Sequence, residues 1–186
     1  SLAGICIEDD SADDSPRGRE RVQADIFTVL PRLHETLTQL KFSTYYSEEE
    51  EEKADEPDVS LCKHVSGLTK LQRLYLNPYY GYPPARDCLQ LSGLRNLAHL
   101  SLPYMHDGVD DTVAAVLVCN MPLLRHLDLC ECELQSDSLL AVMPRCEHLT
   151  QLLVSGNPGF DDELLSHIDR WSRTGFPRFS DVLLRR

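Results

Sequence analysis

Several features that mark membrane, secreted or nucleic-acid-binding proteins are missing from this sequence. Its 186 residues contain no run of 18 or more apolar residues, which excludes a hydrophobic transmembrane helix. The start is not a basic stretch followed by an apolar one, so it does not resemble a signal peptide. Lys and Arg number only 18 against 30 Asp and Glu, for a formal charge of -12. This shortage of basic residues argues against nucleic acid or an acidic membrane surface as the main partner, and we expect protein partners.

Cysteine is present, but without the even, dense pattern of a small disulfide-stabilised domain. The seven cysteines are an odd number and are scattered along the chain, which favours free thiols in a reducing compartment. We therefore expect a cytoplasmic or nuclear protein. The length suits one domain of roughly 100–200 residues. Because the sequence starts at Ser1 rather than Met, we expect it to be part of a longer chain.

Apolar residues recur with a spacing that predicts a repeat protein. Three apolar residues at relative positions one, four and six occur seven times, and four consecutive copies are offset by 26, 27 and 25 residues. The copies are Leu2-Ile5-Ile7, Leu37-Leu40-Phe42, Leu71-Leu74-Leu76, Leu97-Leu100-Leu102, Leu124-Leu127-Leu129, Leu149-Leu152-Val154 and Phe179-Val182-Leu184. Helical periodicity in segments 19–30, 112–118, 137–143 and 161–168 lies between copies. Alternating strands and helices predict a parallel sheet with helices outside it.

A polar or thiol residue follows some copies by three positions, as Cys132 and Asn157 do. The pattern LxxLxL followed by Asn or Cys resembles the leucine-rich repeat. This resemblance implies an α/β leucine-rich-repeat solenoid over residues 1–186, with about seven repeats, a parallel concave sheet and outer helices in a horseshoe. Over roughly residues 119–168, with Cys119, Cys132 and Cys146, the repeats are similar to those of the F-box adaptors that recognise substrates for ubiquitin ligases. An F-box itself is not visible.

The predicted concave face supplies the candidate partner-binding residues. Residues on either side of the second template leucine alternate away from the core, and a solenoid usually binds through this face. The candidates, including tyrosines near the strand ends, are Arg73, Tyr75, Tyr79, Tyr80, Tyr82, His99, Ser101, Tyr104, His126, Asp128, Gln151 and Leu153. Gln39 and Lys41 occupy the same column.

All seven tyrosines lie in a predicted strand or in the loop directly after one. Prolines prevent a helix over residues 77–84, so the rings of Tyr79, Tyr80 and Tyr82 should emerge along one edge of the sheet. Tyrosine is enriched at interfaces, which favours this edge as a contact surface. For Tyr45 and Tyr104, an equal alternative is that the ring caps the end of the core.

An acidic loop insertion is predicted at residues 47–58. Residues 48–58 hold eight acids and one Lys, for -7, and residues 1–14 hold five acids, for -5. The two segments account for the whole net charge, so the body is neutral overall and a local basic patch is compatible with it. The insertion is either a solvated loop or a device that steers a basic partner toward the tyrosines.

Enzyme chemistry is weighed and set aside. His126, Asp128 and Cys130 alternate along one predicted strand, which could suggest a Cys-His-Asp nucleophile or a metal site. Side chains of one solenoid column meet routinely, however, and no oxyanion turn or second ligand cluster accompanies them. We predict no catalytic, cofactor or metal site. The leading hypothesis is a non-enzymatic protein-interaction scaffold, in the narrower form a substrate-recognition subunit of a ubiquitin ligase; the alternative is a structural subunit of a larger assembly.

Overall fold

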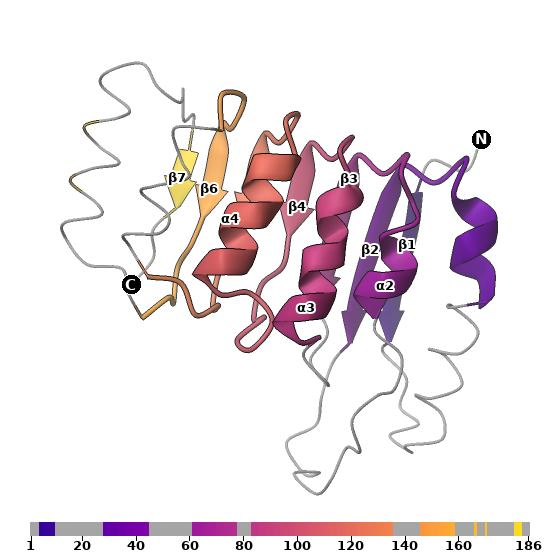
Figure 1. The fold of residues 1–186 in the computed structure, drawn as a ribbon, viewed down its shortest axis with the longest axis horizontal. Helices are drawn as coiled ribbons and strands as arrows, with labels where there is room; N and C mark the ends of the chain where they lie inside the picture. Colours follow the sequence, from indigo (N-terminus) through magenta and orange to yellow (C-terminus); the bar gives the residue numbers. More distant parts are fainter. Residues whose placement is uncertain are drawn as a thin grey trace, which may run out of the picture.

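Seven parallel strands form a single sheet in sequence order, from β1 to β7, in the part of the chain that the structure describes. This computed structural model describes residues 4–9, 28–44, 61–77, 83–135, 146–158, 166, 170 and 181–183. The strands are β1 Gly4–Asp9, β2 Gln39–Thr44, β3 Arg73–Asn77, β4 His99–Ser101, β5 His126–Asp128, β6 Gln151–Leu153 and β7 Asp181–Leu183 (Figure 1). The helical elements are η1 Leu30–Leu33, α2 Leu61–Val65, α3 Ala85–Cys88, η2 Leu89–Gly93 and α4 Asp111–Asn120.

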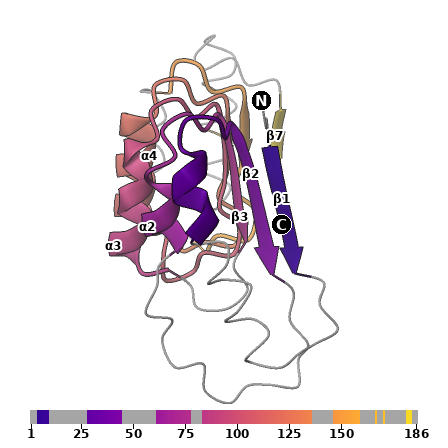
Figure 2. The ribbon, with the colours of Figure 1, turned by 90° about the vertical axis from the view of Figure 1, so that its right-hand side faces the viewer.

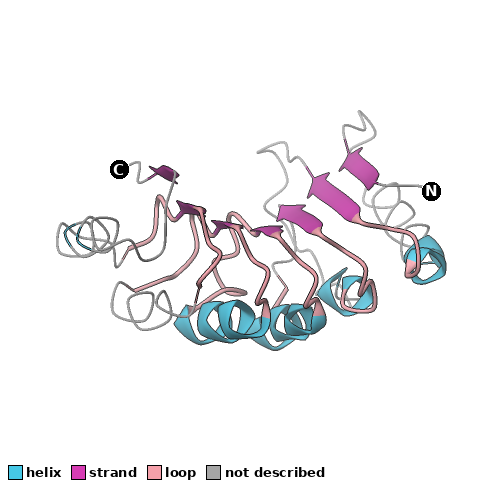
Figure 3. Ribbon diagram, turned by 90° about the horizontal axis from the view of Figure 1, so that it is seen from above, coloured by secondary structure: helices cyan, strands magenta, loops and turns pink. Residues whose placement is uncertain are grey.

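The helices and the strands occupy two layers. Helices α2, α3 and α4 lie on one side of the sheet, as the side view shows (Figure 2). Seen from above, the strands form one row and the helices a second row beneath it (Figure 3). We call the sheet face that points away from the helices the open face. This arrangement, an α/β fold with an all-parallel sheet, fits the leucine-rich-repeat fold.

The template residues form the core between the two layers. In the five copies from Leu37 to Val154, all fifteen template residues are at most 4% exposed. Ile5 and Ile7 of the first copy pack against this core while partly exposed. Burial at every template position explains why the spacing recurs, because each repeat must place three apolar side chains in the same layer.

Strand pairing confirms the repeat alignment. The second template residues pair in order from Ile5 through Leu40, Leu74 and Leu100, and then through Leu127 and Leu152 to Val182. The pairing keeps this register even though β2 and β3 are separated by a longer segment than the later strands. Residues Phe179 and Leu184 lie outside the described part.

The polar or thiol residue three positions after the last template residue links neighbouring repeats in two successive cases. The side-chain amide of Asn157 donates to the carbonyl oxygens of Leu129 and Val154, both at 2.8 Å. Its Oδ1 accepts a hydrogen bond from the Leu134 amide at 3.1 Å. One repeat earlier, the thiol of Cys132 donates to the Leu102 carbonyl at 3.3 Å. Each side chain therefore reaches the last template leucine of the preceding repeat.

The second residue after the last template residue adopts a left-handed conformation in three successive repeats. Tyr104, Glu131 and Gly156 have φ values of 62°, 53° and 73°, and each lies two residues after the last template residue of its repeat. Left-handed backbone costs a non-glycine residue about 1–2 kcal/mol. The regular backbone bonds from Tyr104 N to Cys130 O and from Glu131 N to Ser155 O, at 2.9 and 2.8 Å, hold this turn.

One predicted helix is confirmed, and the other predicted helical segments lie almost entirely outside the described residues. Helix α4 covers the predicted segment 112–118, and the Asp110 carboxylate caps its start by accepting a hydrogen bond from the Val113 amide at 2.8 Å. The segment 137–143 and almost all of 161–168 and 19–30 lie outside the described residues. The short helices α2, α3 and η2 were not predicted from the sequence.

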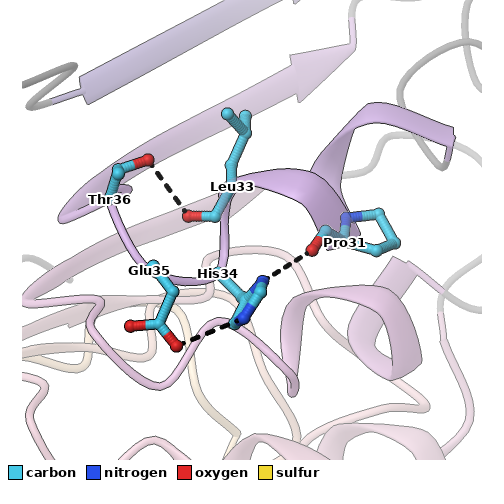
Figure 4. Close-up of polar contacts among 5 residues, drawn as sticks. All are labelled: Pro31, Leu33, His34, Glu35 and Thr36. Atoms are coloured by element: carbon cyan, nitrogen blue, oxygen red, sulfur yellow. Dashed lines mark hydrogen bonds and ion pairs between the residues drawn. The ribbon is translucent and has the colours of Figure 1, made fainter.

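Polar contacts fix the segment that joins η1 to β2. After η1, His34 Nδ1 donates to the Pro31 carbonyl oxygen at 2.9 Å, and the Thr36 hydroxyl lies 3.5 Å from the Leu33 carbonyl oxygen (Figure 4). His34 Nε2 also lies 3.2 Å from the Glu35 carboxylate. These contacts satisfy carbonyls at the helix end, where the backbone leaves acceptors without partners. The chain then enters the core at Leu37.

Candidate functional site

The candidate residues on the strands meet on the open face as adjacent columns. Gln39, Arg73, His99, His126 and Gln151 pair successively in one column. The second column lies two residues further along each strand. It runs through Lys41, Tyr75, Ser101, Asp128 and Leu153. Neighbouring strands lie about 4.8 Å apart, so side chains from different repeats form one continuous surface.

Exposure along these columns is uneven. Arg73 is exposed, and most of the other candidates on the strands are half-buried. Ser101 is only 8% exposed, and its hydroxyl donates to Asp128 Oδ2 at 2.7 Å. The other oxygen of Asp128 accepts from the Cys130 amide at 3.2 Å. Ser101 therefore orients the Asp128 carboxylate rather than presenting a free hydroxyl.

Two histidines stand side by side in the first column. The ring centroids of His99 and His126 are 5.7 Å apart, and His126 Nδ1 lies 2.7 Å from Gln151 Oε1. Burial, followed by the charges of Arg73, His126 and Arg125, lowers the pKa of His99. The lowered pKa favours the neutral imidazole, which can offer a hydrogen bond and a flat ring to a ligand.

Tyr75 is held from two sides. The Lys41 ammonium lies 5.5 Å from the centre of the Tyr75 ring, within the range of a cation–π contact. The Asn77 side-chain amide donates to the Tyr75 hydroxyl at 3.4 Å. These contacts fix an amphipathic ring on the open face, which suits a protein interface.

The open face contains a shallow hollow of about 410 Å³. Its lining includes the candidates Arg73, Tyr75, His99, Ser101 and His126, together with Lys41. Strand β1 adds Gly4 and Cys6, which the sequence reasoning did not single out, although their pairing with Gln39 and Lys41 follows from the repeat spacing. The structure thus brings five candidates from three strands into one depression.

The tyrosine edge is described only in part. Tyr104 follows β4 and is 46% exposed, with a positive φ that projects it from the turn. The ring is therefore accessible to a partner, and its role in binding stays a prediction. Tyr45, Tyr46, Tyr79, Tyr80 and Tyr82 lie outside the described residues, as does the acidic insertion at residues 47–58.

The residues weighed for catalysis are not arranged as a nucleophile and its base. Burial raises the pKa of Cys130 to about 11, and the nearby Asp128 adds to this effect. A reactive cysteine needs a lowered pKa instead. His126 contacts Gln151, while Asp128 contacts Ser101. Among the described residues, no group of three or more His, Cys, Asp or Glu side chains could hold a metal ion.

Comparison with known proteins finds only distant structural likenesses. No protein-family model matches the chain, and no curated protein matches it significantly. Among solved structures, the chain is similar to an internalin C2 from Listeria monocytogenes, with a TM-score of 0.49 and 17% identity over 80% of this chain and 62% of that one. A second internalin from the same organism has a TM-score of 0.27 and 13% identity over 87% of this chain and 64% of its own. The chain thus spans less than two thirds of either internalin.

The described helices are all too short or too polar to cross a membrane.

Proposed function

We propose that the chain is a leucine-rich-repeat horseshoe that acts as a non-enzymatic scaffold and binds a protein partner through its open face. The observation that carries the proposal is the double column of side chains on β2 to β6. The template positions hold an apolar residue in every repeat, whereas the open-face positions are chemically mixed. One column holds Gln, Arg, His, His and Gln, and the other holds Lys, Tyr, Ser, Asp and Leu. This pattern is expected when core packing restricts the residues on one face of the sheet and partner recognition selects the residues on the other.

The chemistry of the open face supports a protein ligand. Tyr75 supplies apolar area, Arg73 a planar cation, and Asp128 a carboxylate already oriented by Ser101. Aromatic residues and Arg carry much of the binding energy in protein interfaces. His99 and His126 of the same face are half-buried, so their side chains are already restricted. A partner that excludes water from the hollow therefore pays little entropy for ordering them.

The narrower proposal is substrate recognition for a ubiquitin ligase, in the cytoplasm or nucleus. It is supported by the cysteine-containing repeats around Cys119, Cys132 and Cys146, of which Cys132 donates to the backbone of the preceding repeat. The alternative is a structural subunit of a larger assembly. A substrate-recognition subunit would increase ubiquitination of its captured partner when the full-length protein is added, whereas a structural subunit would co-purify in fixed stoichiometry and leave ubiquitination unchanged.

The placement of the interface is tested by affinity capture with quantitative mass spectrometry. The bait carrying Arg73→Ala, Tyr75→Ala and His99→Ala should lose at least about tenfold of the partner signal, because alanine replacement of interface anchors typically costs more than 1 kcal/mol each. A matched bait changes exposed residues on the helical side. It carries Lys63→Ala, Arg86→Ala and Gln90→Ala and should retain the partner. An unchanged partner list for the open-face variant refutes the placement.

The tyrosine edge and the acidic insertion are tested separately. The variant Tyr79→Ala, Tyr80→Ala, Tyr82→Ala should also weaken capture if that edge belongs to the interface. Deleting residues 47–58 should slow association with a basic partner at low salt and have little effect at high salt, because salt screens steering. An unchanged association rate at low salt would rule out steering by the insertion.

A further inference from the structure

A second hollow, of about 460 Å³, lies at the amino ends of the strands and is separate from the open-face hollow. We call it the amino-edge hollow; in Figure 1 this edge is where the strand arrows begin. Its lining residues all lie one or three residues before the start of β3, β4, β5 or β6. They are Lys70, Gln72, Asn96, Ala98, Leu123, Arg125 and His148.

The repeat places these side chains in two rows. Backbone bonds from Ala98 N to Gln72 O and from Arg125 N to Ala98 O, both 2.8 Å, extend the strand ladder by one position. Gln72, Ala98 and Arg125 therefore lie on adjacent chains, about 4.8 Å apart. Two residues earlier in each repeat lie Lys70, Asn96, Leu123 and His148.

A small side chain explains why the hollow exists. Ala98 has the shortest side chain in its row and lies between the longer Gln72 and Arg125. Beside it, the Asn96 amide donates to the Thr69 carbonyl at 2.8 Å, which draws that side chain toward the preceding repeat. Space is thus left above Ala98, with polar side chains around it.

The hollow is basic, in contrast to the chain as a whole. Its lining includes Lys70 and Arg125 and no carboxylate. The ion pairs within the described part of the chain lie elsewhere, between His34 and Glu35 and between Arg86 and Asp87. No carboxylate of the described residues pairs with Lys70 or Arg125, so an added negative charge beside these two cations is favourable.

An apolar residue lies among these cations. Leu123 is 48% exposed, unusually high for a leucine in this repeat. Amide side chains at Gln72 and Asn96 can bond to a peptide backbone, and Ala98 with Leu123 can contact one apolar side chain. The lining contains no Tyr, Phe or Trp on which a nucleic-acid base could stack, which favours a peptide over a nucleic acid.

We infer that the amino-edge hollow binds an acidic peptide segment of a partner protein. Carboxylates of the segment contact Lys70 and Arg125, and an apolar side chain contacts Leu123 above Ala98. This goes beyond the proposed function, since it assigns a second surface and the chemistry of the segment that occupies it.

Selection from random peptides displayed on phage tests the inference directly. The full chain is the bait, and peptides that also bind the variant Lys70→Glu, Arg125→Glu are removed. The recovered peptides should be rich in Asp and Glu around an apolar residue. By fluorescence anisotropy, they should bind the double variant at least about tenfold more weakly and lose affinity as salt is raised. Ala98→Gln should also weaken binding, by filling the space without changing charge.

A charge-matched control separates a site from general attraction. The variant Lys63→Glu, Arg86→Glu changes the net charge by the same amount on the helical side, where both residues are exposed. It should bind the selected peptides as wild type does. The inference is overturned if no peptide is recovered, if acidic residues are not enriched, if both double variants lose affinity equally, or if single-stranded DNA competes better than the peptides. Circular dichroism of each variant verifies folding, and Ala98→Gln provides a charge-neutral reading if a reversal variant fails to fold.

Discussion

Replacing Asn157 by alanine should destabilise the fold more than replacing any exposed asparagine. Asn157 is 7% exposed, and its side chain makes three hydrogen bonds to the backbone, to Leu129, Val154 and Leu134. A hydrogen bond contributes a net of about 1 kcal/mol, and a buried group left without a partner costs about 1–3 kcal/mol. Asn157→Ala loses all three bonds, but water can enter and bond to some of the backbone groups left without a partner. We therefore expect the free energy of unfolding to fall by about 2–4 kcal/mol.

Urea unfolding followed by circular dichroism measures this loss. The control is Asn96→Ala, which removes one bond from an exposed side chain and should cost no more than about 0.5–1 kcal/mol. Asn157→Cys should fall between wild type and Asn157→Ala, because Cys132 shows that a thiol can bond to the preceding repeat. Equal stability of Asn157→Ala and Asn96→Ala would refute the assignment of Asn157 as a link between repeats.

Three further changes test the packing. Gly108→Ala should destabilise the fold by more than about 1 kcal/mol, because the added methyl group would meet the Pro83 carbonyl oxygen. Asp110→Ala removes the cap of α4 and should cost about 1 kcal/mol in the free energy of unfolding. Burial raises the pKa of Cys132 and of Cys146 to about 12. Above about pH 9 these thiols lose their protons in the unfolded chain but keep them in the folded one, which favours unfolding. The free energy of unfolding should therefore fall by about 1.4 kcal/mol per thiol for each pH unit.

Each of these changes has its own control, measured by urea unfolding. Gly93→Ala, where the new methyl group meets nothing within 4 Å, should be neutral or slightly stabilising; a loss equal to that of Gly108→Ala would contradict the packing argument. Asp107→Ala should change stability by less than about 0.5 kcal/mol. A variant with alanine at Cys132 and at Cys146 should lose stability less steeply between pH 9 and 11 than wild type does, and equal slopes would contradict the linkage.

The strand register could be predicted from the sequence because burial of the template residues in the core sets it. Leu74, Leu100 and Leu127 each enter the core from the same ladder position, so their spacing records the geometry of the sheet. The open-face columns then followed from alternation alone. Which of those side chains contact each other did not follow, because the Ser101 to Asp128 and His126 to Gln151 contacts depend on side-chain rotamers.

The short helices and the amino-edge hollow could not be predicted in the same way. Helices α2 and α3 contain five and four residues, too few for a helical period to be visible in sequence. The hollow depends on one alanine, Ala98, lying between longer side chains of adjacent repeats. Such a relation links residues 26 or 27 positions apart and becomes visible only after the repeats are placed in register.

The constant register across segments of different length makes this chain a candidate for protein engineering. Gln39 pairs with Arg73 across 34 residues, and Arg73 pairs with His99 across 26. The pairing of the strands is therefore independent of the length of the segment that connects them. A reporter peptide or small domain inserted between β2 and α2 should leave the downstream repeats in place, and new chain termini could be opened there, because loop closure becomes only slightly more costly as a connection grows.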